Sequence, residues 1–409
     1  MGTIKQNQDL ETTWMIDASN NTYILGKNAE ISTSGDSAIR VTSGSNNNDL
    51  ILKGDVKASD ALNVINVQGN NTHIAVAQSS FVDGRDVSTA INSSSANLSL
   101  ENAGRIEAQS LGLSIGDFST VTNTGSIIAD TAIFTGDGFA LTNSGKIDGE
   151  VYGLLSGSDG TVIKNLEGGQ IIADTNAIYL FDGGDAMIKN SGLIMAQNAI
   201  TDGDGDSVIV NKGIIAGDVN LGEGNDVFNT RAGKFEGTVN GGDGNDIYIV
   251  GKSSTDIAEQ PGFGKDVVKT TVSFTISENI EELFLQGKKD IDGTGNTGNN
   301  TITGNKGDNV LNGMTGEDYL IGGKGDDTLF GGAGEDMFDF RKGTGNDVVE
   351  DFVNGEDVIY TPFAADEADL LANHLIQKNG GVLLSYGEDS LFIKGVTLAE
   401  LDESDFFTI

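Results

Sequence analysis

Five consecutive nine-residue frames fill residues 295–339 without a gap: GNTGNNTIT, GNKGDNVLN, GMTGEDYLI, GGKGDDTLF and GGAGEDMFD. The first and fourth positions of every frame are glycine, the sixth carries a side-chain oxygen, and the eighth is apolar. Glycine permits a tight, partly left-handed turn, and a single apolar residue among polar ones suits a short strand that faces a narrow core. The stretch therefore predicts a roll of short parallel strands, with two frames to each coil.

Oxygen atoms from the sixth positions are expected to line the edges of this roll, because residues one coil apart lie side by side. A hard cation takes several oxygen ligands at about 2.3–2.6 Å, and turn carbonyls with stacked carboxylates supply them. The predicted ion is Ca²⁺. The first two frames carry asparagine at the sixth position, so their sites should be weaker or empty. The sixth-position residues are Asn300, Asn309, Asp318, Asp327 and Asp336.

The frames resemble the nonapeptide repeat of the RTX family, GGxGxDxUx. The frames that begin at Gly322 and Gly331 fit it in full, whereas Met314 replaces the second glycine of its frame. The resemblance implies a calcium β-roll. A disordered linker rich in Gly, Asn and Asp is the alternative, but such a linker gives no reason for an apolar residue in every frame.

The end of the chain is strand-rich and places Asp405 ahead of Phe406 and Phe407. It is similar to the uncleaved C-terminal signal of type I-secreted RTX proteins. This resemblance implies export by a type I secretion apparatus and a secreted or cell-surface location in bacteria. An ordinary apolar C-terminal strand is the alternative interpretation.

Charge and composition narrow the class of protein. The 409 residues include 61 acidic and 24 basic ones, a formal charge of −37. Such a chain should repel nucleic acid and anionic membranes, and it needs cations to become compact. Cysteine is absent, so metal rather than disulfides would staple an extracellular fold. Residues 1–22 show no cleaved secretory peptide, and no apolar run approaches the ~20 residues of a membrane span.

A longer repeat, Asn-x-x-Gly-x-Ile, precedes the roll. Its apolar marker recurs at steps of 20 to 24 residues, and weaker copies at Ile31, Val56 and Phe81 step by 25. About ten coils of this length predict a parallel β-helix, taken as right-handed by the rule for parallel crossovers. An all-β sandwich is the alternative. The asparagines expected to form a hydrogen-bonded ladder are Asn102, Asn123, Asn143, Asn165, Asn190 and Asn211.

One corner of this repeat changes stepwise into a calcium-type turn, from SIGDF at 114–118 to NGGDGND at 240–246. Asp206, Asp226 and Asp246 are spaced by twenty residues, so their carboxylates are expected to line one edge and bind calcium. Asp347 is expected to add a ligand after the roll. The EF-hand interpretation of DGDGD at 202–206 fails because the required Gly and Glu are missing.

The predicted organisation is a β-helix at 1–250, a β connector at 251–291, the calcium roll at 292–360, and a C-terminal cap with the export signal at 361–409. Runs such as VVKTTVSFTI and IEELFL predict strands in the connector. Residues 364–377 predict the only convincing amphipathic helix of the chain.

Motifs for catalysis are weak. GLSIG at 112–116 matches a nucleophile elbow, but Ser114 falls inside the β-helix repeat and no α/β pattern surrounds it. Only His73 and His374 exist, neither within H-E-x-x-H. The favoured function is a non-enzymatic extracellular protein for adhesion, biofilm matrix or surface coat, with an anionic polysaccharide or cell surface as a possible partner. The alternative is a lyase or uronate epimerase that acts on an anionic glycan.

Overall fold

The computed structural model of the chain describes residues 2–157, 159–364 and 367–408. The fold is all-β and divides into two compact units, residues 1–242 and 243–409. Residues 365–366 of the predicted helix and residue 409 of the predicted export signal lie outside the described residues. Within the described ranges, no helix has the length and apolar character needed to cross a membrane.

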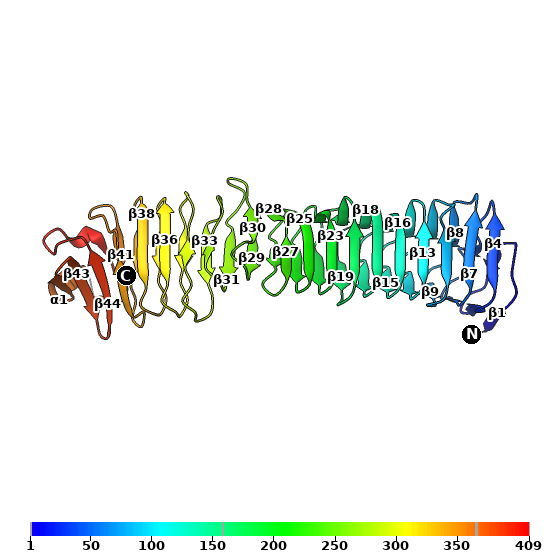
Figure 1. The fold of residues 1–409 in the computed structure, drawn as a ribbon, viewed down its shortest axis with the longest axis horizontal. Coiled ribbons are helices and arrows are strands. Elements are labelled where there is room, and N and C mark those ends of the chain that lie inside the picture. The colour runs from blue at the N-terminus through cyan, green and yellow to red at the C-terminus, as the bar shows by residue number, and fades with distance from the viewer. Residues whose placement is uncertain (1, 158, 365–366, 409) are drawn as a thin grey trace. The chain divides into compact units, whose positions relative to one another are not determined.

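The first unit is a parallel β-helix in which successive coils stack strand upon strand (Figure 1). The strands of its first sheet are β1 (Thr3–Gln6), β3 (Thr22–Leu25), β6 (Asp49–Leu52), β9 (His73–Val76), β12 (Ser99–Asn102), β15 (Thr120–Asn123), β17 (Ala140–Asn143), β19 (Thr161–Asn165), β22 (Ala186–Asn190), β24 (Val208–Asn211) and β26 (Val227–Asn229).

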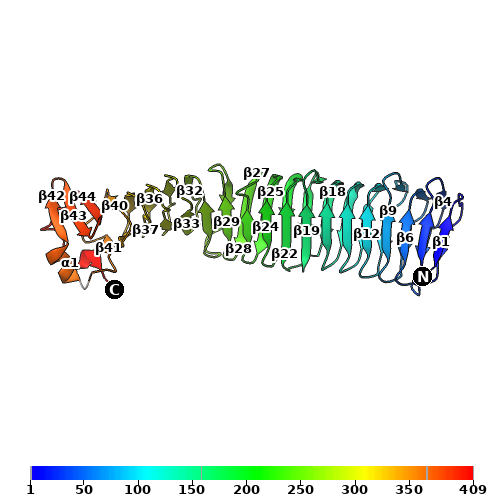
Figure 2. The same cartoon turned by 90° about the horizontal axis from the view of Figure 1, so that it is seen from below.

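The other wall of each coil belongs to a second parallel sheet, seen beside the first in Figure 2. Its strands are β2 (Trp14–Ile16), β4 (Glu30–Ser34), β5 (Ile39–Val41), β7 (Asp55–Ser59), β8 (Asn63–Val67), β10 (Phe81–Gly84), β11 (Thr89–Ser93), β13 (Arg105–Ala108), β14 (Leu111–Ile115), β16 (Ser126–Thr135), β18 (Lys146–Ser156), β20 (Gln170–Ala173), β21 (Asn176–Leu180), β23 (Leu193–Thr201), β25 (Ile214–Glu223), β27 (Lys234–Glu236) and β28 (Thr238–Asp243).

The predicted apolar marker forms the core of this unit. Ile106 pairs with Ile127, which pairs with Ile147, and all three are fully buried. The weaker copy at Phe81 is displaced by one residue, because Val82 rather than Phe81 pairs with Val56. A shift of one residue moves a strand side chain to the opposite face. Val82 is accordingly buried, and the prediction for Phe81 is wrong.

The predicted asparagine ladder is confirmed. Each side-chain amide donates to the amide oxygen of the next coil at 2.8–2.9 Å, from Asn102 through to Asn211, and the six side chains are buried. Because these polar groups are fully paired, they add directional bonds between coils without the penalty of unsatisfied buried atoms. The ladder holds coils of unequal length in one register.

Truncation of a ladder residue tests this role. Asn143 Nδ2 donates to Asn165 Oδ1 at 2.8 Å and to the Gln170 carbonyl at 3.1 Å, and Asn143 Oδ1 accepts from Asn123. Asn143→Ala should lower the free energy of unfolding by about 2 kcal/mol, equally with and without calcium, because buried partners lose their bonds. Urea unfolding followed by circular dichroism measures this. Thr142→Ala, on the half-exposed face of the same strand, is the control and should change little; equal losses would contradict the prediction.

The second unit is a narrower parallel solenoid that ends in an antiparallel cap. One sheet holds β29 (Ile247–Val250), β31 (Val267–Thr270), β33 (Glu282–Leu285), β35 (Thr301–Thr303), β37 (Tyr319–Ile321), β39 (Met337–Asp339), β41 (Val358–Tyr360) and β45 (Phe406–Phe407). Another holds β32 (Phe274–Thr275), β34 (Gly293–Thr294), β36 (Val310–Thr315), β38 (Thr328–Ala333), β40 (Asn346–Val349), β44 (Asp389–Lys394), β43 (Gly381–Tyr386) and β42 (Leu375–Lys378). The remaining elements are β30 (Asp256–Ala258), α1 (Glu367–Asn373) and the 3₁₀ turn at Glu403–Asp405.

The nine-residue frames form the predicted roll. Thr301 pairs with Tyr319 and Tyr319 with Met337, a step of 18 residues, or two frames, in each case. The five eighth-position apolar residues are all fully buried. The strands expected in 251–291 are present, and β31 and β33 pair in parallel with β29 and β35, so this stretch extends the stack with coils of irregular length.

The C-terminal cap differs from expectation in one element. The helix expected over 364–377 ends at Asn373, because β42 pairs antiparallel with β43 from Leu375 onward. Phe406 is buried and pairs with Ile359, so the aromatic end of the chain forms the last strand of the stack.

Candidate metal centre

Two rows of turn residues line the edges of the roll. In one row, the backbone N–H of Asn300 donates to Asp318 Oδ1 at 2.7 Å, and the N–H of Asp318 donates to Asp336 Oδ1 at 2.9 Å. In the other row, the N–H of Asn309 donates to Asp327 Oδ1 at 2.7 Å, and the N–H of Asp327 donates to Asp347 Oδ1 at 2.9 Å. In each row, one carboxylate oxygen per coil therefore holds the register between neighbouring turns.

The second carboxylate oxygen of these aspartates indicates a metal site. Oδ2 of Asp318, Asp327 and Asp336 is buried and has no hydrogen-bond partner, and each residue is at most 2% exposed. An ionised oxygen in that position costs several kcal/mol unless a cation compensates it. Carboxylate oxygens together with turn carbonyls are the ligands that Ca²⁺ prefers. The donor set of the roll thus fits calcium.

Glycines make the close stacking of the turns possible. Gly325 has φ +121°, and a Cβ atom there would lie 2.6 Å from the carbonyl oxygen of Gly307 in the neighbouring coil. Met314, which replaces a repeat glycine, keeps a left-handed backbone with φ +84°. Because side chains rarely adopt this region, the turn at Met314 is strained.

The asparagines at the start of each row are engaged by protein atoms. Asn300 Nδ2 donates to the carbonyl of Ile280 at 3.0 Å, and Asn309 Nδ2 donates to the carbonyl of Ile291. Asn309 Oδ1 accepts from the N–H of Asn305. At the first turn of each row, the side-chain amide group thus donates to a backbone carbonyl oxygen. This hydrogen bond explains how asparagine can replace aspartate in these turns.

Burial raises the pKa of the row carboxyls, to about 7 for Asp318 and Asp327 and about 6 for Asp336 and Asp347. Between about pH 4 and pH 7 the folded roll therefore binds more protons than the unfolded chain, and without calcium its stability falls as the pH rises. Calcium needs the ionised carboxylates, so its stabilising effect should grow over the same range.

This gives a pH prediction. In chelator, the roll should show a melting transition near pH 5 that is weakened or lost near pH 8, whereas the stabilisation caused by calcium should be larger near pH 8. Differential scanning calorimetry at both pH values, with and without calcium, measures both effects. A calcium effect that is independent of pH would contradict a site made of buried carboxylates.

The turn residues of the first unit are arranged differently from expectation. Asp226 is buried, and its Oδ1 accepts from the N–H of Ser207 at 2.7 Å, whereas the exposed Asp206 accepts from the N–H of Asn225. Paired positions here are 19 residues apart, so Asp206 does not align with Asp226. The predicted stacking of these two carboxylates at a step of twenty residues is therefore wrong, whereas calcium binding by Asp206 and Asp226 stays a prediction. Asp202, which was not predicted, is the buried carboxylate of that coil.

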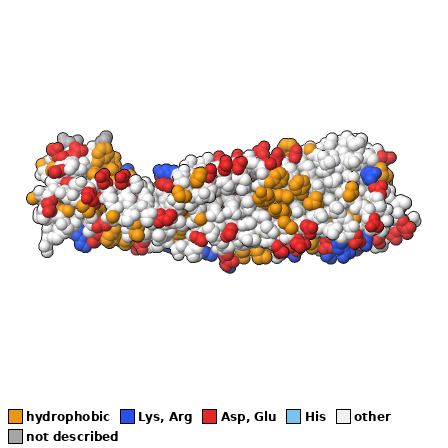
Figure 3. Space-filling view, turned by 90° about the horizontal axis from the view of Figure 1, so that it is seen from above, with side chains coloured by type: hydrophobic (Ala, Val, Ile, Leu, Met, Phe, Trp, Pro, Cys, Tyr) orange, Lys and Arg blue, Asp and Glu red, His pale blue; other side chains and the backbone are white. Residues whose placement is uncertain are grey.

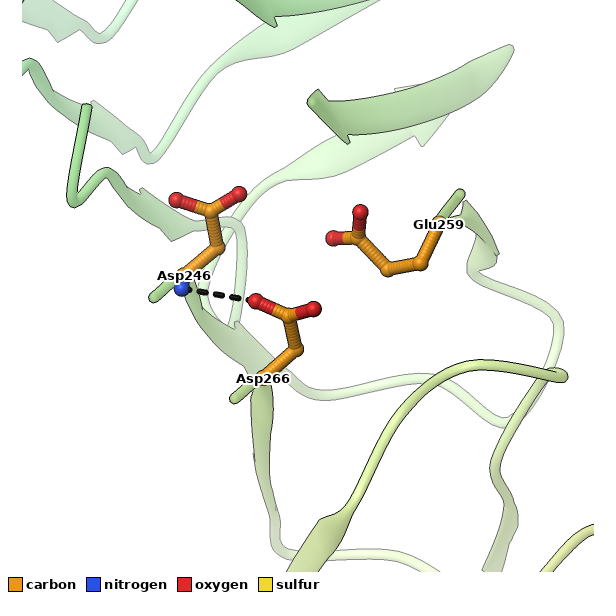
Figure 4. Close-up of side chains that lie close together, drawn as sticks. All are labelled: Asp246, Glu259 and Asp266. Carbon is orange, nitrogen blue, oxygen red and sulfur yellow. Dashed lines mark hydrogen bonds between the residues drawn. The ribbon is translucent and has the colours of Figure 1, made fainter. Parts of the chain in front are cut away.

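Asp246 belongs to the second unit and lies in a cluster with two unpredicted acids. Asp246, Glu259 and Asp266 each bring a carboxylate oxygen within 4.8 Å of the others (Figure 4). The N–H of Asp246 donates to Asp266 Oδ1 at 2.8 Å, and the Tyr248 hydroxyl donates to Glu259. Burial raises the pKa of Asp266 to about 7. The G-x-G-x-D turn at 262–266 was a usable signal for Asp266, whereas Glu259 has no repeat position.

Comparison with known proteins identifies the family that the repeat block matches. Residues 294–328, 305–338 and 313–349 match the family of the RTX calcium-binding nonapeptide repeat (4 copies). Among solved structures, the chain is similar in part to the extracellular lipase LipA from Serratia marcescens, with 15% identity and a TM-score of 0.26. That match covers 55% of this chain and 44% of the lipase chain. No curated protein sequence matches the chain. Residues 294–349 are therefore an RTX calcium-binding repeat block, and it belongs to a chain whose other coils form a parallel β-helix.

Proposed function

We propose that the protein is secreted, that extracellular calcium completes its fold, and that it acts without catalysis in adhesion, biofilm matrix or a surface coat. The observation that carries this proposal is the set of buried, unpartnered Oδ2 atoms of Asp318, Asp327 and Asp336. Where calcium is scarce, these charges oppose folding of the roll and favour an export-competent chain. Extracellular calcium-binding modules have dissociation constants of about 10⁻⁴–10⁻³ M. With an affinity in this range, the roll would bind calcium and fold only after it has left the cell.

The placement of the candidate catalytic residues supports a role without chemistry. Ser114 lies within β14, paired with Phe134 on the neighbouring strand, and not on a strand-to-helix turn. His73 lies on β9 of the first unit, next to Ser99. His374 belongs to the second unit and contacts the Ser385 carbonyl and Asp369. Acidic side chains are spread over the face shown in Figure 3, which suits the binding of calcium, and bound calcium can in turn bridge to an anionic glycan.

An activity screen in millimolar-range calcium tests the proposal. The chain is incubated with a panel of anionic polysaccharides while viscosity, unsaturated-sugar absorbance and co-sedimentation are followed together. Co-sedimentation without cleavage is the expected result. Chain cleavage or new absorbance would overturn the non-enzymatic role and favour a lyase or epimerase.

A further inference from the structure

Four lysines of the second unit recur at an interval of 18 residues, the length of one coil of the roll. They are Lys288, Lys306, Lys324 and Lys342, and they are referred to as the lysine row. All four side chains are exposed. In a chain with 24 basic and 61 acidic residues, the row is a periodic concentration of exposed cations, and it runs beside the exposed aspartates Asp290, Asp308 and Asp326 of the same turns.

Backbone contacts show that the turns carrying the row are stacked. The N–H of Lys324 donates to the Asn305 carbonyl at 3.0 Å. Two positions after the lysines, the N–H of Asp308 donates to Asp290 Oδ1 at 3.0 Å, and the N–H of Asp326 donates to Asp308 Oδ1 at 2.9 Å. Neighbouring strands are about 4.8 Å apart, so successive lysines start from backbone positions with about that spacing.

The last lysine joins the row despite a change of coil length. The step from Asp326 to Asn346 is 20 residues, because the N–H of Asn346 donates to Asp326 Oδ1. Lys342 nevertheless lines the same hollow of the surface as Lys306 and Lys324. The row therefore continues to the end of the roll.

The described structure shows no ion pair between the lysine row and a carboxylate of the chain. Among the residues that the structure describes, no carboxylate lies within 4.0 Å of these four amino groups. The neighbouring Arg341 is different, because its guanidinium is paired with Asp339 at 2.7 Å. The amino groups of the row remain available to a ligand.

The opposite edge of the roll shows that the turns do not require lysine. The equivalent third positions there are Thr297, Thr315 and Ala333. Acidic fifth positions nevertheless occur on that edge too, at Glu317 and Glu335. Since both edges have the same turn geometry and similar acidic neighbours, compensation of turn charge does not explain a row on one edge alone.

We propose that the lysine row binds a linear polysaccharide that carries a carboxylate on each sugar. A single file of cations suits a single extended polyanion, and the four-carbon stem of lysine reaches past the shorter aspartates of the same turns. The lining of the hollow includes asparagine and threonine but no aromatic residue, whereas binders of single-stranded nucleic acid stack bases on aromatic side chains. The inference rests on the proposed function in one respect: calcium must fold the roll for the row to form.

The test compares two quadruple variants of the full chain in calcium. One replaces the row (Lys288→Gln, Lys306→Gln, Lys324→Gln and Lys342→Gln). The control makes the same change in net charge on exposed lysines of the first unit (Lys27→Gln, Lys53→Gln, Lys164→Gln and Lys189→Gln). The probe is an oligogalacturonate too short to gel with calcium. Binding is measured by calorimetry at two salt concentrations, and folding by circular dichroism in calcium and in chelator.

The row variant should bind at least about tenfold more weakly than the unaltered chain, with a flatter salt dependence, and the control should bind normally. Equal binding by both variants would overturn the inference. Tighter binding of a single-stranded DNA of equal charge would also overturn it and indicate nucleic acid. Loss of calcium-dependent folding in the row variant alone would show that the lysines only stabilise the roll. An unaltered chain that folds in calcium but does not bind the probe refutes this inference alone, whereas a chain that ignores calcium refutes the proposed function.

Discussion

Removal of calcium with a chelator should unfold the repeat block at 294–349 while the coils of the first unit keep their structure. The physical reason is that the two kinds of coil are held together differently. The repeat block buries Oδ2 atoms of Asp318, Asp327 and Asp336 without a protein partner, so loss of the cation leaves uncompensated buried charge. The coils at 98–201 have a wide apolar core and a fully paired asparagine ladder, neither of which involves a metal.

Hydrogen exchange followed by mass spectrometry measures this effect for each segment. Amides of 301–349 should lose their protection in chelator and regain it when excess calcium is returned, while those of 99–165 should stay protected throughout. Magnesium at the same concentration is a useful control, because it prefers a smaller octahedral site and should restore little protection. Persistent protection of 301–349 in chelator would contradict calcium-dependent folding of the roll.

Much of the fold was predictable because the length of each repeat can be read directly from the sequence. In the nine-residue frames, glycine, oxygen and apolar positions recur together, so the stacking of Asp318 on Asp336 follows from counting alone. The asparagine ladder was predictable for a similar reason, since five of its six asparagines lie four residues before a buried isoleucine, and the sixth, Asn165, lies six residues before Ile171. Sequence periodicity is reliable where several chemically different positions repeat in phase.

The errors occur where coil length varies. Thr22 pairs with Asp49 after 27 residues, whereas Val208 pairs with Val227 after 19. The extra residues lie in loops, and the amino-acid composition of these loops does not show where a coil becomes longer. A constant step of 25 therefore selected Phe81 in place of Val82, and a constant step of 20 aligned Asp206 with Asp226. Glu259 could not be found at all, because a cluster of three acids from two turns depends on loop geometry and not on a repeat.

The Asp327→Asn variant should need about a hundredfold more calcium to fold the roll. Asp327 Oδ1 accepts the N–H of Asn309 at 2.7 Å, and an amide oxygen can preserve that bond. The buried Oδ2, however, becomes an NH₂ group that repels a cation, so a ligand and its charge are both lost. Even residues that only orient metal ligands change affinity by 10–100-fold when mutated, and a direct ligand should reach the upper end of that range.

Asp326→Asn is the matched control, because it removes the same charge from the adjacent residue. Asp326 is exposed, and its Oδ1 accepts from the N–H of Asn346 at 2.9 Å, a bond that an amide oxygen also preserves. A calcium titration followed by circular dichroism should shift strongly for Asp327→Asn and little for Asp326→Asn. In chelator the order should reverse, with Asp327→Asn more stable than the unaltered chain, because the buried charge that opposes folding is gone. Equal shifts for both variants would mean that calcium responds to the net charge of the roll, and the buried rows would then lose their role as ligands.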